Sequence, residues 1–237
     1  MTDEIPVLYE DDTLLAVNKP SGFLSASERF EPEIRVVARE LEMEYGHLWP
    51  IHHLDQDISG VLLFAKKEQA AKVLWRRLED REIGIVYHAV VGARPSWTET
   101  VCEYSLTPDG DRMHRTIIDG AGKPALTEFT VLGCHAKLAI IEARPMTTRP
   151  DQVRIHLTAL GYPVLCDPLY GDGKPLFLSK IKRRWKGDAE RERPLISRTA
   201  LHSFSMELKH PGTGQTLAIE APYPKDFKAL VTQLRKI

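Results

Sequence analysis

The sequence predicts a single α+β domain over residues 1–237, built on a large mixed, mainly antiparallel sheet with flanking helices. Short β-type segments separated by polar turns dominate the chain, and stretches with helical spacing of apolar residues lie between them. No internal repeat and no linker-like stretch divides the sequence. With 237 residues, 43% of them hydrophobic and 27% charged, the chain is long enough to form a soluble globular core.

The first half of the chain begins with a predicted β-hairpin and then alternates between helices and strands. Residues Ile5–Lys19 form the hairpin, which the turn residues Pro20–Gly22 close. The next elements are a helix over Pro32–Tyr45, a polar turn and buried strand over Ile51–Ala65, a helix over Glu68–Glu82, and a strand over Ile85–Val91. The last three make a strand–helix–strand unit, so we expect its two strands to be neighbours.

The second half is richer in strands and carries one charged segment. The predicted elements are strands over Thr100–Leu106, Ala125–Leu132 and Lys137–Ala143, a helix over Pro150–Leu160 with Pro150 in its first turn, an extended segment over Val164–Tyr170, a charged insertion over Gly171–Pro194, a hairpin over Ser203–Ile219, and a helix over Lys225–Leu234. We expect the insertion (residues 171–194) to contribute little to the core.

Charge and cysteine content restrict the possible locations and partners. The net charge of −1 offers no global argument for nucleic-acid binding, so only a local patch such as the basic stretch Lys180–Arg198 supports it, and acidic residues dilute that stretch. Three scattered cysteines favour a reducing compartment, and no apolar run has the length of a signal core or a membrane span. The sequence therefore predicts a cytoplasmic protein. We expect a monomer, because no coiled coil or extra apolar face is evident.

Asp55 is the first candidate site residue. It lies in a polar turn just before the apolar run Val61–Ala65, where a buried strand gives a carboxylate rigid support. Such a carboxylate suits an acid, a base or a nucleophile. The alternative is an aspartate that accepts backbone N–H bonds from the Ser59–Gly60 turn, and residue chemistry alone favours this alternative.

Three further groups could carry chemistry. Tyr87 lies in the strand that follows, although an interior tyrosine usually belongs to the core with its hydroxyl bonded. Arg149 and Arg154 bracket the start of a helix and suit a phosphate or carboxylate, unless they pair with surface acids. The segment Arg198–His202 joins the basic stretch to a strand.

Five motifs, in matching order and separation, resemble those of the RluA-type pseudouridine synthases. They are Tyr9–Asp12 with Asn18–Gly22, His52–Gly60, Gln152–Leu157, Asp167–Gly171 and Ala200–Ser203. The second resembles the family's His-Arg-Leu-Asp-x-x-Thr-Ser-Gly, and the third resembles Gln-Ile-Arg-x-His-Leu. The resemblance runs from about Val7 to Leu208. It implies the pseudouridine synthase catalytic fold, here without room for the separate N-terminal, S4-like RNA-binding module that many relatives carry.

The resemblance implies an isomerase that converts specific uridines of structured ribosomal or transfer RNA to pseudouridine by base flipping, with no cofactor and no metal. Asp55 matches the nucleophile, Tyr87 matches the tyrosine beneath the uracil, and Arg154 matches the arginine that pairs with the aspartate. Leu201 matches an apolar residue that packs against the target base. Arg198, together with the basic insertion, is then expected to contact RNA phosphates.

The chain departs from the family's motifs at two places. His53 stands where the family has an arginine, to which the resemblance gives a part in displacing the target base. We expect a weaker, pH-dependent contact from His53. Residues Thr147–Arg154 replace Thr-Gly-Arg-Thr-His-Gln-Ile-Arg, which removes the glycine and puts a negative charge at Asp151. Arg149 and Gln152 are retained and are expected to bind substrate.

Two alternatives remain open from the sequence. One is an RNA-binding protein on the same fold that has lost catalysis, an idea that the changes at His53 and Asp151 favour. The other is a metallohydrolase that uses His52, His53, Asp55 and Asp57. Adjacent residues on an extended segment seldom face one metal ion, which counts against that alternative.

Overall fold

The computed structural model describes residues 5–26, 34–135, 137–182 and 184–236, and within them the chain forms two compact units. The first unit comprises the chain up to Tyr87 together with His202–Pro222, and the second comprises His88–Leu201 together with the chain from Tyr223 onward. The units therefore interleave along the sequence. The expectation of a single domain stays a prediction.

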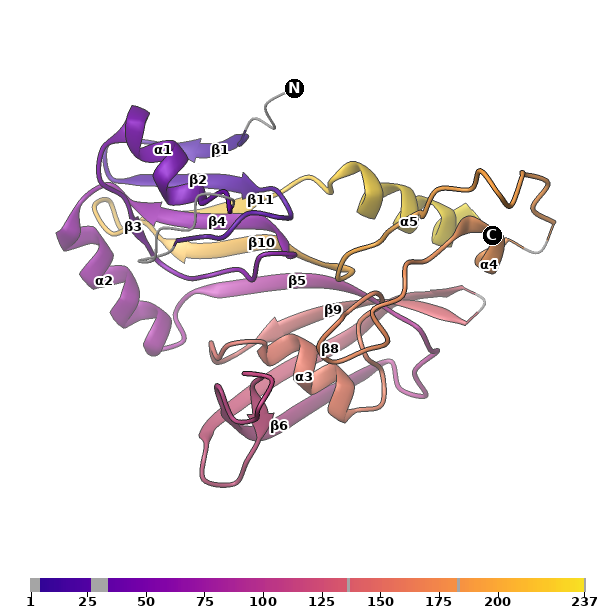
Figure 1. Cartoon of the computed structure of the whole chain (residues 1–237). Helices are drawn as coiled ribbons and strands as arrows, with labels where there is room; N and C mark the ends of the chain where they lie inside the picture. Colours follow the sequence, from indigo (N-terminus) through magenta and orange to yellow (C-terminus); the bar gives the residue numbers. More distant parts are fainter. Residues whose placement is uncertain (1–4, 27–33, 136, 183, 237) are drawn as a thin grey trace. The chain divides into compact units, whose positions relative to one another are not determined.

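The first unit is built on strands in the spatial order β1-β2-β4-β10-β5 (Figure 1). These strands are β1 (Val7–Glu10), β2 (Leu14–Lys19), β4 (Ser59–Ala65), β10 (Leu201–Lys209) and β5 (Gly84–Val91). Two more strands extend the set, β3 (Trp49–Pro50) beside β4 and β11 (Thr216–Glu220) beside β10. The β4–β10 pair is parallel, whereas β1–β2, β2–β4 and β10–β11 are antiparallel.

Strand β4 is the centre of the first unit. All seven of its residues are buried, as the unbroken apolar run predicts for a strand covered on both faces. Helix α2 (Glu68–Glu79) contacts β4 and buries Ala71 and Leu74 in the same core, and α1 (Val37–Tyr45) completes the unit. Gly60 lets β10 approach, because a Cβ atom at this position would lie 2.1 Å from the backbone oxygen of Ser203.

The second unit includes β5 from His88 onward, and its strands follow the order β5-β9-β8-β6-β7. Its elements are β6 (Glu99–Thr107), β7 (Ile117–Ile118), β8 (Lys123–His135), β9 (Leu138–Pro145), α3 (Gln152–Ala159), α4 (Leu178–Ile181) and α5 (Lys225–Lys236). The β6–β7, β6–β8 and β8–β9 pairs are antiparallel. Helix α3 contacts β6, β8 and β9. Helix α5 contacts β8 and buries Phe227 and Leu230 completely.

The predicted α+β class with mixed, mainly antiparallel strands is confirmed, and most elements begin and end within a few residues of the predicted bounds. The helix predicted over Pro32–Tyr45 is observed from Val37, and its first two residues lie outside the described part of the chain. Over the described residues, no helix combines the length and apolar character needed to cross a membrane.

Two predictions about extended segments are wrong. Strands β4 and β5 are not neighbours, because β10 lies between them, where Gly60 permits its close approach. The segment Val164–Tyr170 is not extended beyond a single bridge at Val164; it folds into turns. The cause is Asp167, whose side-chain oxygen accepts the backbone N–H groups of Leu169 and Tyr170 and closes an Asx-type turn.

Candidate active site

Asp55 lies in the first unit at the start of a tight turn that leads into β4. Its backbone oxygen accepts the N–H of Ile58 at 3.0 Å, and its side chain is half-buried. Strand β4 begins at Ser59, so the turn is fixed to the most buried strand of the unit. This is the rigid support for a carboxylate that the sequence predicts.

Two residues hold the backbone on either side of Asp55. Lys19, fully buried, donates from Nζ to the backbone oxygen of Gln56 at 3.0 Å and to that of Phe23 at 2.5 Å. The Ser25 hydroxyl donates to the Leu54 oxygen and accepts the Leu54 N–H, both at 2.8 Å. A buried ammonium group requires such partners, since its desolvation is costly. Sequence reasoning missed both residues, although Lys19 belongs to a quoted motif.

Tyr87 lies on β5 in the same unit, and the charge of Asp55 affects the pKa of its hydroxyl. Burial raises the pKa of the Tyr87 hydroxyl, and the negative charge of Asp55 raises it further, against a smaller opposing contact with the Ser203 hydroxyl. The phenol therefore keeps its proton at neutral pH. The structure thus brings Asp55 and Tyr87 within electrostatic reach of each other, as two members of the predicted catalytic set.

The two histidines before Asp55 differ in environment. His52 is buried, and its Nε2 accepts the N–H of Leu63 at 3.4 Å. Burial, helped by the neighbouring His53, lowers the pKa of His52 to about 4. His53 is exposed, and partial desolvation lowers its pKa below the usual range. Among the described residues, no group of three or more His, Cys, Asp or Glu side chains is arranged to hold a metal ion.

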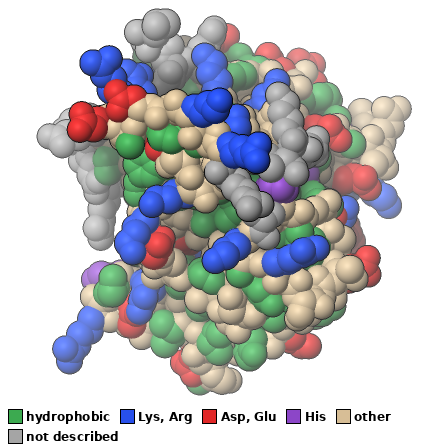
Figure 2. Space-filling view, turned by 90° about the vertical axis from the view of Figure 1, so that its right-hand side faces the viewer, with side chains coloured by type: hydrophobic (Ala, Val, Ile, Leu, Met, Phe, Trp, Pro, Cys, Tyr) green, Lys and Arg blue, Asp and Glu red, His purple; other side chains and the backbone are tan. Residues whose placement is uncertain are grey.

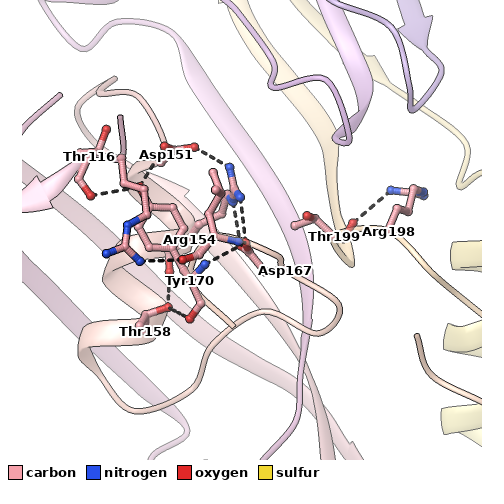
Figure 3. Close-up of polar contacts among 10 residues, drawn as sticks. Thr116, Asp151, Arg154, Thr158, Asp167, Tyr170, Arg198 and Thr199 are labelled. Atoms are coloured by element: carbon pink, nitrogen blue, oxygen red, sulfur yellow. Dashed lines mark hydrogen bonds and ion pairs between the residues drawn. The ribbon is translucent and has the colours of Figure 1, made fainter. Parts of the chain in front are cut away.

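Arg154 lies in the second unit, in the first turn of α3, and is 5% exposed (Figure 3). Its Nε and Nη2 atoms donate to the two carboxylate oxygens of Asp167 at 2.7 and 2.8 Å, and its Nη1 donates to Asp151 at 2.5 Å. Asp167 is fully buried, yet the hydrogen bonds and charge of Arg154 and two backbone N–H groups hold its pKa below the ordinary value. Sequence reasoning missed this pair, because only folding brings the two residues together.

Asp151 precedes α3 in a backbone conformation that non-glycine residues seldom adopt. Its φ angle is 56°, in the left-handed region that aspartate tolerates better than most residues. Its second carboxylate oxygen accepts the Tyr170 hydroxyl at 2.9 Å. The helix therefore begins at Gln152, and Pro150 precedes it rather than lying in its first turn as predicted.

The predicted substrate-binding residues of the second unit make contacts within that unit. Gln152 is buried and joins the loop before α3 to β8: its Oε1 accepts the Thr147 hydroxyl at 2.9 Å and its Nε2 donates to the Leu126 oxygen at 2.9 Å. The same Oε1 accepts the backbone N–H of half-buried Arg149 at 3.1 Å. These contacts show how the loop is held, and the binding roles stay predictions.

Arg198 lies shortly before β10, and Leu201 is the first residue of that strand. Arg198 pairs with Asp226 through hydrogen bonds of 2.8 and 3.1 Å, and Figure 3 shows its guanidinium donating to the Thr199 oxygen at 3.2 Å. Leu201 is 1% exposed. Phosphate and base contacts by these two side chains also stay predictions.

Comparisons with known proteins agree on one family. The model of the family described as RNA pseudouridylate synthase matches residues 13–159. A Pasteurella multocida protein named ribosomal large subunit pseudouridine synthase C is 31% identical, over 98% of this chain and 69% of that protein. The Escherichia coli K12 protein of the same name is 32% identical over 97% and 70%. The solved structure of human RNA pseudouridylate synthase domain containing 4 has a TM-score of 0.73 at 21% identity, covers 97% of this chain and 93% of that one, and is therefore similar in fold.

Proposed function

Because this chain belongs to the family of RNA pseudouridylate synthases, isomerases that act on RNA, we propose that it converts uridine in ribosomal RNA to pseudouridine with Asp55 as the nucleophile. The names of two relatives specify the large ribosomal subunit, which favours ribosomal over transfer RNA as the substrate. The observation that carries the nucleophile assignment is the position of Asp55. It is half-buried in a turn whose backbone is held by hydrogen bonds from Lys19 and Ser25, and its charge raises the pKa of the Tyr87 hydroxyl.

The chemistry needs little beyond positioned side chains. The bond between uracil N1 and ribose C1′ breaks, the uracil turns, and a bond forms between C5 and C1′. The proton lost from C5 balances the one gained at N1, so the reaction has no net redox change. An ionised Asp55 supplies the nucleophile, whether it attacks the sugar or the base. Tyr87 supplies a neutral phenol beneath the uracil, because its raised pKa keeps it protonated.

The remaining predicted residues are assigned to substrate binding. Leu201 packs against the target base, and His53 contacts the flipped-out nucleotide. Because the pKa of His53 is lowered, its imidazole is neutral at pH 7 and gains charge only under acidic conditions. Arg149, Gln152 and Arg198 contact the RNA. Arg154 acts with Asp55 and Tyr87 in the chemical step.

The charged insertion is the proposed surface for RNA phosphates. Its exposed cations include Lys180, Lys182, Arg184 and Lys186. Figure 2 shows one face of the molecule, on which several Lys and Arg side chains lie with acidic groups among them. Local positive charge of this kind suits a phosphate backbone in a protein whose net charge is close to zero.

The test is replacement of Asp55 by asparagine, with Asp57→Asn as the matched control. Both aspartates are half-buried in the same turn. Asp55→Asn should abolish pseudouridine formation, because an amide is no nucleophile, and Asp57→Asn should leave most of it. The measurement is pseudouridine mapping of ribosomal and transfer RNA from a strain that lacks the gene and carries each variant. Modification close to the wild-type level with Asp55→Asn would refute the assignment.

The alternative of an RNA-binding protein without catalysis gives a different result in the same experiment. The wild-type protein would then bind RNA, and the maps with and without the gene would be identical. The changes at His53 and Asp151 are the observations in its favour. The hydrogen bonds of Lys19 and Ser25 that hold the turn around Asp55, together with the raised pKa of Tyr87, favour catalysis instead.

A further inference from the structure

Two carboxylates of the second unit hold the guanidinium of Arg154. Asp167 accepts the Nε and Nη2 hydrogens as a fork, and Asp151 accepts a hydrogen from Nη1 (Figure 3). All three side chains are 14% exposed or less. The cluster contains one positive and two negative charges. Its net charge is therefore −1, although its central group is a cation.

Each carboxylate is itself fixed by other contacts. Asp167 accepts the backbone N–H groups of Leu169 and Tyr170 at 2.9 and 3.1 Å, so its position is set by its own turn. Asp151 accepts the Tyr170 hydroxyl at 2.9 Å, and that hydroxyl also lies 3.0 Å from the Thr116 backbone oxygen. The guanidinium carbon of Arg154 lies 5.1 Å from the centre of the Tyr170 ring. Few orientations of the arginine satisfy all of these contacts at once.

We propose that Asp167 and Asp151 are positioning residues that hold Arg154 as a donor of fixed geometry, whose positive charge is largely compensated. This inference rests on the proposed function, in which Arg154 takes part in the chemical step. A compensated guanidinium contributes little net field. It contributes instead through the direction of its N–H groups, which the planar guanidinium fixes. A lysine ammonium has rotatable donors and cannot reproduce that arrangement. Asp167, which accepts both the Nε and the Nη2 hydrogens, is the main positioning residue.

The first experiment needs no substrate. It tests whether Asp167 and Asp151 hold the Arg154 guanidinium in place, an arrangement called the clamp below. A ¹⁵N spectrum of the arginine Nε–H groups should show a slowly exchanging signal for Arg154, assigned by its loss in Arg154→Lys. Asp167→Asn should speed its exchange at least about tenfold, because the ionic fork is lost. Asp111→Asn is the control: Oδ2 of Asp111 accepts both Nε and Nη2 of Arg115, and its Oδ1 accepts the backbone N–H groups of Met113 and Arg115. This variant should change only the Arg115 signal. An Arg154 signal that exchanges equally fast in wild type and Asp167→Asn would overturn the clamp.

The second experiment tests the consequence for catalysis, normalised to the folded fraction of each variant. Asp167→Asn should lower kcat by about 10²-fold with KM for RNA nearly unchanged, the size of effect expected when a catalytic group is displaced by about 1 Å. Arg154→Lys should lower kcat at least as much, although it keeps the charge, and Asp111→Asn should stay near wild type. Substantial kcat in Arg154→Lys, or a wild-type kcat in Asp167→Asn, would overturn the proposal. A wild-type protein that forms no pseudouridine would refute the proposed function instead, and the exchange experiment would still decide on the clamp.

Discussion

Gly60 shows how a single residue sets the packing around the candidate site. Its φ angle is 122°, and an added Cβ atom would meet the backbone of Ser203 at 2.1 Å. We expect Gly60→Ala to lower the free energy of unfolding by more than about 3 kcal/mol, because neither backbone can yield without breaking the β4–β10 pair. Urea unfolding of the purified variant measures this.

The control for this prediction is Gly214→Ala in the hairpin between β10 and β11. Gly214 also has a positive φ, 74°, but nothing lies within 4 Å of an added Cβ atom. This variant should cost only about 1–2 kcal/mol, the penalty for a left-handed non-glycine residue. Equal losses in the two variants would mean that backbone conformation, and not the approach of β10, explains the need for glycine at position 60.

At the same scale, the sequence could predict residues whose chemistry is local, and it missed those defined by distant partners. The turn that carries Asp55 and the strand after it were predictable, because a polar turn before an apolar run is visible in a few consecutive residues. Lys19 was missed as a site residue because the acceptor that links it to the Asp55 turn, the backbone oxygen of Gln56, is distant in the sequence. Asp167 was missed for the same reason, since its bond to Arg154 joins a loop to a helix.

At the scale of elements, long segments with clear periodicity were predictable and very short ones were not. Helices α2 and α5 and strand β4 follow from patterns over many residues. Strands β3 and β7, with two residues each, carry no such pattern, and neither does the four-residue helix α4. The place of β10 between β4 and β5 could not be predicted, because strand order depends on pairing between segments far apart in the sequence.

The insertion is the element with the clearest testable role. Replacing Lys180, Lys182 and Arg184 together by glutamine should weaken RNA binding. It should also make the dependence of log Kd on log salt concentration shallower, by about 0.7–0.9 for each phosphate that the variant no longer neutralises. Fluorescence anisotropy over a salt series measures both quantities.

The matched control removes three exposed cations from the region of α2, Lys67, Lys72 and Arg76. It changes the net charge equally, so a general electrostatic effect would appear in both variants. An unchanged slope in the insertion variant would show that these side chains are a solvated surface only.

At the scale of the whole molecule, each unit contains a buried histidine that resists protonation. Burial is the main cause that lowers the pKa of His52 in the first unit, and it lowers that of His156 in the second, each to about 4. An unfolded histidine titrates near 6.5, so between pH 6.5 and 4 the unfolded state binds more protons. The free energy of unfolding should therefore fall as the pH decreases through this window, by at most about 1.4 kcal/mol per pH unit for each histidine.

Urea unfolding at pH 7.0, 6.0 and 5.0 measures this dependence, in a range above the titration of most carboxylates. His52→Gln and His156→Gln should each flatten it, because glutamine takes up no proton. A slope that is equally steep in the wild type and the double variant would assign the effect to other groups.

The pairing of β4 with β10 also has a consequence for how the protein is made. Ser59 and His202 lie side by side in this pair, although 143 residues separate them in the sequence. A ribosome releases the apolar strand β4 early and its partner β10 only after the whole of residues 66–200. During that interval one edge of β4 lacks its native neighbour, and such an edge readily pairs with the wrong strand. The strand that supports Asp55 in the folded enzyme is thus open to mispairing along that edge until β10 has been made.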